Sequence, residues 1–225
     1  MCHALALVRI DTIEMVNEPL SIAPLPRLLA SYAGREAARH RLVWAYDARL
    51  ADVVRTTREP MVGQMRLTWW HEVLSDDSGT KGRGDPLVDA LRADPGLSAM
   101  RDALLAMIDG WEMLLDPLPL DEDALRSFAD GRGGGLFRAL DHSADPKAGA
   151  LWALWDLSGH IGDATTAQRA VALAQSYLPV PSRGQKPVRL ATGLARHDIA
   201  LGHTGPQALT PRLYLRLLRM AALGR

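Results

Sequence analysis

The spacing of apolar residues constrains the fold of this chain more than any other feature. Between residues 35 and 57, Leu42, Tyr46, Leu50 and Val53 recur at intervals of three or four, which places their side chains on one face of an α-helix. Alternating runs of β-branched residues, typical of strands, are absent, and leucine, alanine and arginine, which favour helices, are common. The pattern therefore predicts an all-α fold.

Prolines and glycines divide the first part of the chain. Three prolines predict that residues 1–27 form an irregular N-terminal segment, because proline disrupts the interior of a helix. Pro60 instead fits the first turn of a second helix, which is expected over 61–74. The glycines of 75–85 then indicate a loop.

Apolar stripes and capping residues predict the remaining helices. A long stripe predicts a helix over 97–115, and Asp121 is expected to cap a helix that runs to Phe128. The glycines of 131–135 are expected to interrupt that element and to allow close helix packing. Together these elements predict one domain, residues 1–225, of seven or eight helices. Further helices are expected over 147–160, 165–177, 187–201 and 211–223.

Composition narrows the classes of function. The chain has 26 basic residues (lysine and arginine) and 26 acidic residues (aspartate and glutamate). This balance argues against a general binder of nucleic acid or anionic membranes, although it leaves room for a local basic pocket. The single cysteine, Cys2, permits no disulfide within the chain and fits a reducing compartment. Without a basic leader or a run of about 18 apolar residues, we expect no transmembrane segment. We expect a cytoplasmic location, with peripheral contact at the inner membrane as an option.

Two segments resemble the squalene/phytoene synthase family. Residues 39–74 read RHRLVWAYDARLADVVRTTREPMVGQMRLTWWHEVL, and GQMRLTWW is similar to a helix start of that family. Residues 107–137 contain MIDGWEM and FADGRGGGLF, which resemble two further stretches of the family in the expected order. A weaker similarity lies at 148–164. The GQMRLTWW segment most resembles non-catalytic members, among them an assembly factor for respiratory complex I.

The resemblance implies a fold and a chemistry. The fold would be that of the isoprenoid synthases, a helical bundle with a central cavity. The chemistry would join two prenyl diphosphates head to head. In that family two facing clusters of aspartates hold Mg²⁺, which binds the diphosphate and neutralises the charge that develops as it leaves.

The first aspartate cluster of the family is degenerate in this sequence. Its D-D-x-x-D pattern falls on residues 51–55, where Ala51 and Arg55 stand at the outer positions and only Asp52 remains. Carboxylates at i and i+4 share a helix face, so the resemblance leaves the metal-binding pair incomplete. Asp47 lies about 140° around the helix from Asp52 and cannot easily share an ion with it.

Arginines in the same segment offer two interpretations. The simpler one is an ion pair of Asp52 with Arg49 or Arg55 on the helix surface. The other is direct binding of an anionic head group, without metal, by Arg49, Arg55 and Arg66.

Acidic residues on the predicted third helix form a further candidate. Asp109, Glu112 and Asp116 fall at i, i+3 and i+7 along one flank, where a solvated surface is the simpler interpretation. If the flank lines a cavity, these acids could bind a metal or pair with the arginines. The resulting candidates for a cavity or diphosphate site are Arg49, Asp52, Arg55, Arg66 and Glu112.

The second aspartate cluster has only a loose counterpart. Asp156 and His160 have the i, i+4 spacing of a ligand pair, and Asp163 could correspond to the last aspartate of the family pattern. A surface pair or a helix cap is the simpler role for these residues. Asp52 and Asp163 are therefore only weak metal candidates. His197 and Asp198 lack further ligands at metal-site spacing, so a metal phosphohydrolase is not favoured.

Three functions are compatible with the sequence. The leading hypothesis is a non-catalytic, squalene/phytoene synthase-like protein without a cofactor. It would act in assembly with respiratory-complex subunits or bind an isoprenoid or lipid. The alternative is an active Mg²⁺-dependent prenyl transferase of carotenoid, squalene or hopanoid biosynthesis. The third is a helical interaction module with a filled core.

Overall fold

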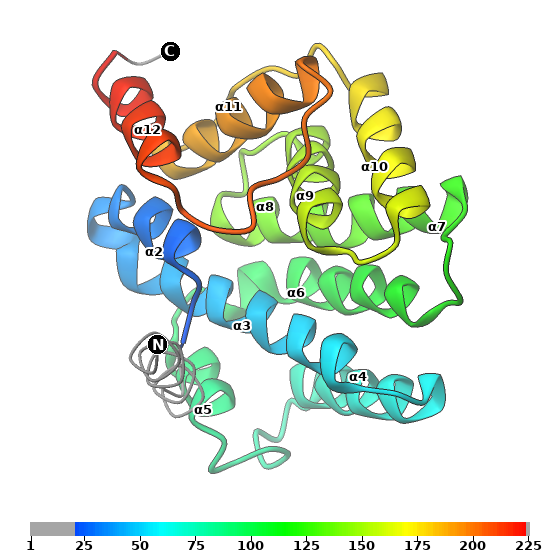
Figure 1. The fold of residues 1–225 in the computed structure, drawn as a ribbon. Coiled ribbons are helices and arrows are strands. Elements are labelled where there is room, and N and C mark those ends of the chain that lie inside the picture. Colours follow the sequence, from blue (N-terminus) through cyan, green and yellow to red (C-terminus); the bar gives the residue numbers. More distant parts are fainter. Residues whose placement is uncertain (1–20, 224–225) are drawn as a thin grey trace, which may run out of the picture.

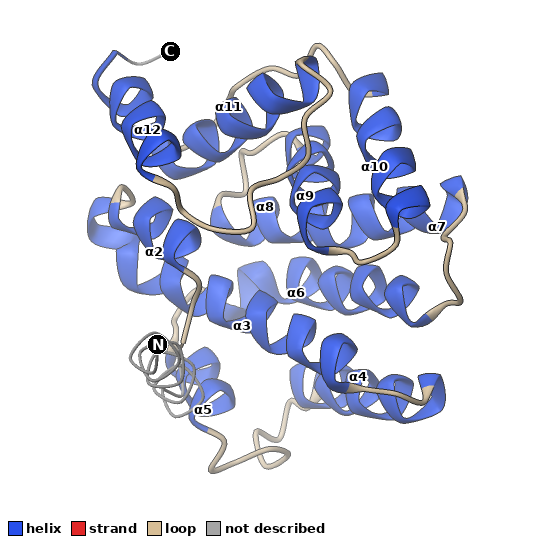
Figure 2. Ribbon diagram, viewed as in Figure 1, coloured by secondary structure: helices blue, strands red, loops and turns tan. Residues whose placement is uncertain are grey.

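The chain is all-helical over residues 21–223, the part described by the computed structural model (Figures 1 and 2). The predicted all-α class is confirmed, with no strand in those residues and with more helices than the seven or eight expected. None of the helices in this range is long and apolar enough to cross a membrane. The α-helices are α2 Pro24–Ser31, α3 Ala37–Thr56, α4 Pro60–Ser75, α5 Pro86–Ala93, α6 Leu97–Glu112, α7 Glu122–Phe128, α8 Gly135–Leu140, α9 Pro146–His160, α10 Ala164–Ser176, α11 Lys186–Ala200 and α12 Pro211–Leu223.

Three helices, α2, α5 and α8, were not expected. Residues 24–27 were predicted to be irregular, but Pro24 occupies the first turn of α2, where a helix needs no N–H from proline. Helix α5 follows the same rule with Pro86 at its start. The carboxylate of Asp85 caps it by accepting the N–H groups of Leu87 and Val88. The rest of the predicted N-terminal segment, 1–20, lies outside the described residues.

The glycine-rich segment continues the helix that it was expected to interrupt. Ala129–Gly134 form the π-helical turn η3, which joins α7 directly to α8. The predicted cap of α7 is confirmed, since the Asp121 carboxylate accepts the N–H of Ala124 at 2.8 Å. The missing side chains serve close packing instead, because a Cβ on Gly131 would meet the backbone of Gly110 on α6 at 2.8 Å.

Helices α3, α6 and α9, together with η3, surround the core. In Figure 1, α4 and α5 lie on one side of the α3–α6 pair, and α9 to α12 lie on the other. The largest fully buried side chains include Trp152, Trp155, Tyr46, Phe128 and Phe137. Trp152 packs against Trp155 with ring centroids 4.8 Å apart, so large aromatic rings fill the middle of the bundle.

Candidate functional site

A buried network of charges joins three of the central elements. It contains Asp47 from α3, Arg132 from η3 and Asp156 from α9. The side chain of Arg132 is only 5% exposed, and that of Asp47 is 7% exposed. Helical spacing placed Asp47 about 140° around its helix from Asp52, and the structure shows that this side of α3 faces the interior and η3.

The guanidinium of Arg132 bridges the two carboxylates. Its Nε and Nη2 donate to the two carboxylate oxygens of Asp47 at 3.0 and 2.9 Å, which is a bidentate pair. Its Nη1 lies 2.8 Å from Oδ2 of Asp156. Trp111 of α6 donates its indole N–H to the same Asp47 carboxylate at 2.8 Å. The network therefore holds α3, α6, η3 and α9 together through one cation.

Aromatic rings complete the surroundings of Arg132. The guanidinium carbon lies 4.3 Å from the Trp111 ring centroid and 5.5 Å from that of Phe128. Burial alone would lower the pKa of Arg132, but the charges of Asp47 and Asp156 more than offset it and raise the pKa above its usual value. Arg132 is therefore a permanent cation in the interior, and its charge is matched by its neighbours.

The network reaches the surface through α9. The side chain of Asp156 is 27% exposed, and His160 beside it is half exposed. Nδ1 of His160 lies 3.5 Å from Oδ1 of Asp156 and 2.8 Å from its backbone carbonyl oxygen. The i, i+4 pair singled out in the sequence thus exists, and its acid faces inward to Arg132 rather than outward to a metal.

The residues of the predicted anion site make separate contacts. Asp52 forms the predicted surface pair with Arg55 at 2.5 Å. Arg49 reaches Asp85 at the start of α5 at 3.1 Å, and Arg66 donates to the hydroxyl groups of two threonines at the end of α3. The binding role proposed for these side chains stays a prediction.

Glu112 and Asp163 belong to other helices than the first group. Glu112 ends α6 and is partly buried. Asp163 caps α10 by accepting the N–H of Thr166 at 2.6 Å, the cap that the simpler interpretation expected. The hydroxyl and N–H of Thr166 lower the pKa of Asp163, so its carboxylate is stabilised as a cap.

These carboxylates do not fit the Mg²⁺ that the family resemblance implies. A magnesium site needs carboxylate oxygens that are available to the ion. Both oxygens of Asp47 are taken by Arg132, Asp52 is paired with Arg55, and Asp163 is a helix cap. Among residues 21–223, no group of three or more His, Cys, Asp or Glu side chains is placed to hold a metal ion.

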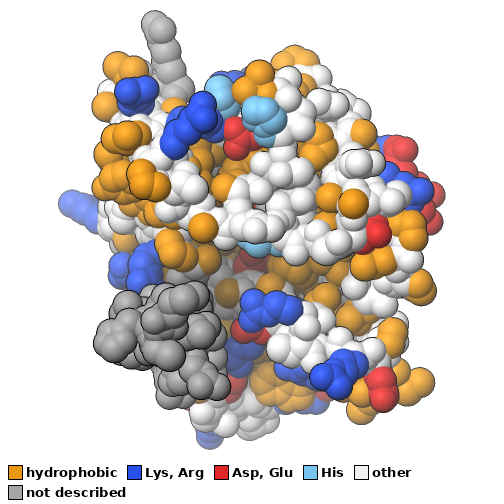
Figure 3. Space-filling view, in the orientation of Figure 1, with side chains coloured by type: hydrophobic (Ala, Val, Ile, Leu, Met, Phe, Trp, Pro, Cys, Tyr) orange, Lys and Arg blue, Asp and Glu red, His pale blue; other side chains and the backbone are white. Residues whose placement is uncertain are grey.

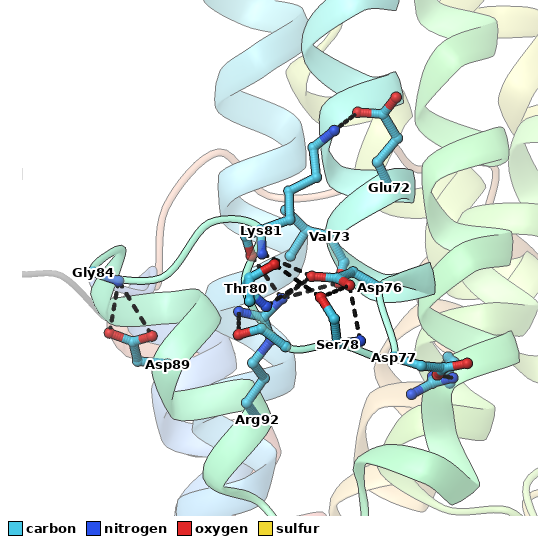
Figure 4. Close-up of polar contacts among 12 residues, drawn as sticks. Glu72, Val73, Asp76, Asp77, Ser78, Thr80, Lys81, Gly84, Asp89 and Arg92 are labelled. Atoms are coloured by element: carbon cyan, nitrogen blue, oxygen red, sulfur yellow. Dashed lines mark hydrogen bonds and ion pairs between the residues drawn. The ribbon is translucent and has the colours of Figure 1, made fainter.

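Two pockets lie away from the central network. One, of about 160 Å³, lies between the end of α4, the following loop and α5. On its wall the Asp76 carboxylate accepts the N–H groups of Ser78, Thr80 and Lys81, while Arg92 donates to loop carbonyls (Figure 4). The hydroxyl of Ser78 and these N–H groups lower the pKa of Asp76. This carboxylate organises the loop and has no oxygen directed at a ligand.

The second pocket is a groove of about 450 Å³ between α11 and α12. Basic side chains from α11 and apolar side chains from α12 line it. Its lining includes Lys186, Arg189, Leu190, Arg196, Met220 and Ala222.

Sequence analysis missed Arg132, the centre of the network. The arginine lies within the glycine cluster that was interpreted as a packing element, and that interpretation is correct for its neighbours. One signal was available, because an arginine flanked by glycines inside an otherwise apolar helix needs an acidic partner. The identity of the partners, 85 and 24 residues away in the sequence, could not be obtained from helical spacing.

A scan against protein-family models finds no match, and comparisons with curated proteins and with solved structures give no significant match either. The family resemblance therefore rests on the segments quoted above.

Proposed function

We propose that this chain is a non-catalytic, squalene/phytoene synthase-like protein that acts by binding a protein partner. The observation that carries the proposal is the position of Arg132 between the carboxylates of α3 and α9. In the family, facing helices carry carboxylates that share Mg²⁺ with a diphosphate. Here two facing helices carry carboxylates that already pair with a side chain of the protein.

The chemistry of a guanidinium supports this proposal. Catalysis by a bound metal requires an ion with coordination positions that the substrate can enter. Arg132 directs three of its N–H donors at Asp47 and Asp156, and its guanidinium contacts aromatic rings, so it is already engaged by groups of the protein. The network supports the role of a rigid structural link between helices.

The packing of the core favours a partner at the surface over a ligand in the centre. Trp152, Trp155 and Phe137 are fully buried, and their rings pack together in the middle of the bundle. Both pockets described above lie elsewhere. We therefore propose an assembly role, with respiratory-complex subunits as the partners that the resemblance suggests, ahead of storage of an isoprenoid inside the bundle.

The first test is a direct assay of the family reaction. Purified protein is incubated with Mg²⁺ and with fifteen- or twenty-carbon prenyl diphosphates, and diphosphate release is measured. We expect no release above a protein-free control, because residues 21–223 contain no group of three or more His, Cys, Asp or Glu side chains placed to hold the metal. Turnover of either substrate would overturn the proposal.

A restored motif provides a matched comparison. The double variant Ala51→Asp with Arg55→Asp places carboxylates at i and i+4 on α3, beside Asp52. We expect calorimetry to detect Mg²⁺ binding to this variant and none to the unaltered chain. Equal binding by both proteins would show that the unaltered chain already has a metal site.

The assembly role has its own readout. We expect a tagged chain to co-purify with respiratory-complex subunits, and a deletion strain to lose complex I activity until the gene is restored. A deletion strain with an unchanged respiratory chain would contradict the assembly role, while leaving the result of the prenyl diphosphate assay unaffected.

A further inference from the structure

The charges of this chain are segregated, although their total is zero. Residues 164–225 contain nine lysines and arginines but a single acid, Asp198. That acid is already paired, since its carboxylate accepts from Arg216 at 2.5 Å and from the indole N–H of Trp155 at 3.2 Å. The part of the molecule built from α10, α11 and α12 is therefore strongly basic.

Helix α12 has two apolar faces. Leu213 and Leu217 are buried against the rest of the fold. At about 100° per residue, Tyr214, Leu215 and Leu218 fall on a different side of the helix. They are 41%, 53% and 37% exposed, so nothing in the described part of the chain covers this outer face.

Cations lie on α12 and also on its neighbour α11. Arg212 and Arg219 lie on one flank of α12 and are exposed, and Figure 3 shows basic and hydrophobic side chains together over this helix at the upper left. The groove between α11 and α12 adds three cations from α11, which are Lys186, Arg189 and Arg196. Ala222 of α12 lines the same groove. Among residues 21–223, none of these five cations forms an ion pair.

We propose that α12, with the basic groove that it forms with α11, docks on the surface of an anionic phospholipid membrane. At a bilayer interface the acyl chains lie directly below the phosphate groups. A helix without acids, with leucines beside arginines, can place the leucines among the acyl chains and the arginines at the phosphates. The apolar face lies parallel to the bilayer, and the five cations reach the phosphates around it. A nucleic acid would use the cations but leave the exposed leucines in water, so the apolar face favours the membrane.

This inference stands on different residues from the proposed function and does not depend on it. The neutral total charge argued against an anionic-membrane binder, and that argument fails when the charges are separated in space. A second exposed apolar patch, Met61 and Met65 on α4, lies beside Glu59 and provides a matched control surface.

The test is co-sedimentation of the full chain with vesicles. At low ionic strength we expect binding to phosphatidylcholine vesicles that contain phosphatidylglycerol, weak binding to phosphatidylcholine alone, and release as salt is raised. The double variant Arg212→Gln with Arg219→Gln should bind about 30-fold more weakly, and Leu215→Gln with Leu218→Gln about tenfold more weakly. These side chains are exposed, and circular dichroism checks that each variant is folded.

The control variant Met61→Gln with Met65→Gln should bind as the unaltered chain does. Four outcomes would overturn the proposal: no vesicle binding at all, equal binding to neutral and anionic vesicles, loss of binding in the α4 control but not in the α12 variants, or binding to duplex DNA without binding to vesicles.

Discussion

A single side chain, Arg132, is the counter-ion of two carboxylates in the interior of the bundle. Two carboxylates from distant parts of the chain are buried or partly buried only because its guanidinium lies between them. Ion pairs within one helix are easier to predict. The surface pair of Asp52 with Arg55 could be predicted from spacing alone, because both residues lie on α3. Asp47 could not be assigned to the interior in this way, since its partner comes from another helix.

Removal of the cation should be costly. We expect Arg132→Met to lower the free energy of unfolding by about 3–5 kcal/mol, because it leaves the Asp47 carboxylate buried without a counter-charge. Arg126→Met, which breaks an exposed pair with Glu122, should change the free energy of unfolding far less, because solvent screens that pair. Urea denaturation of both variants measures the difference, and equal effects would refute a structural role for the network.

Close approach of backbones determines how the central elements pack. Gly133 of η3 and Gly149 of α9 lie so near each other that a Cβ on either residue would overlap the carbonyl group of the other. The sequence indicated this role for the glycine cluster correctly. It also predicted α3, α4, α6 and α9 to α12 within a few residues, because their apolar stripes are long. The short helix α5 was missed although Asp85 and Pro86 mark its start.

A methyl group at the glycine contact tests this packing. We expect Gly149→Ala to destabilise the fold by about 3 kcal/mol or more, because backbone on both sides would have to move. Gly162→Ala is the matched control, since its Cβ would meet nothing within 4 Å. Thermal unfolding should show a large decrease for the first variant and almost none for the second. A tolerated Gly149→Ala would mean that α9 and η3 can separate at little cost.

Across the whole molecule, acid should weaken the fold in two steps. His40 of α3 is fully buried, and neither ring nitrogen has a hydrogen-bond partner in the described part of the chain. Burial lowers the pKa of His40 below 6.5, against the opposing effects of Gln185 and two nearby carboxylates. Burial would raise the pKa of Asp141, but the N–H of Gln185 and the Ser143 hydroxyl and N–H together lower it below 3.8.

A group whose pKa is lower in the folded protein than in the unfolded chain stabilises the folded state most at pH values above its pKa in the unfolded chain. This stabilisation is lost as the pH decreases towards the pKa in the folded protein. The free energy of unfolding should therefore fall first below about pH 6.5, from His40, and again below about pH 3.8, from Asp141. Urea midpoints measured across the acid range should lose the upper step in His40→Leu and the lower one in Asp141→Asn. The control variant His71→Gln, at an exposed position, should keep both steps. If the upper step persists in His40→Leu, His40 is not the cause of that step.

The identity of the internal cation has a consequence for the cell. An ion held by aspartates must be acquired after synthesis, and it can be lost to competing chelators or replaced by another metal. Arg132 is produced with the polypeptide and stays with it. The centre of this bundle can therefore mature wherever the chain is translated, whatever the supply of metals.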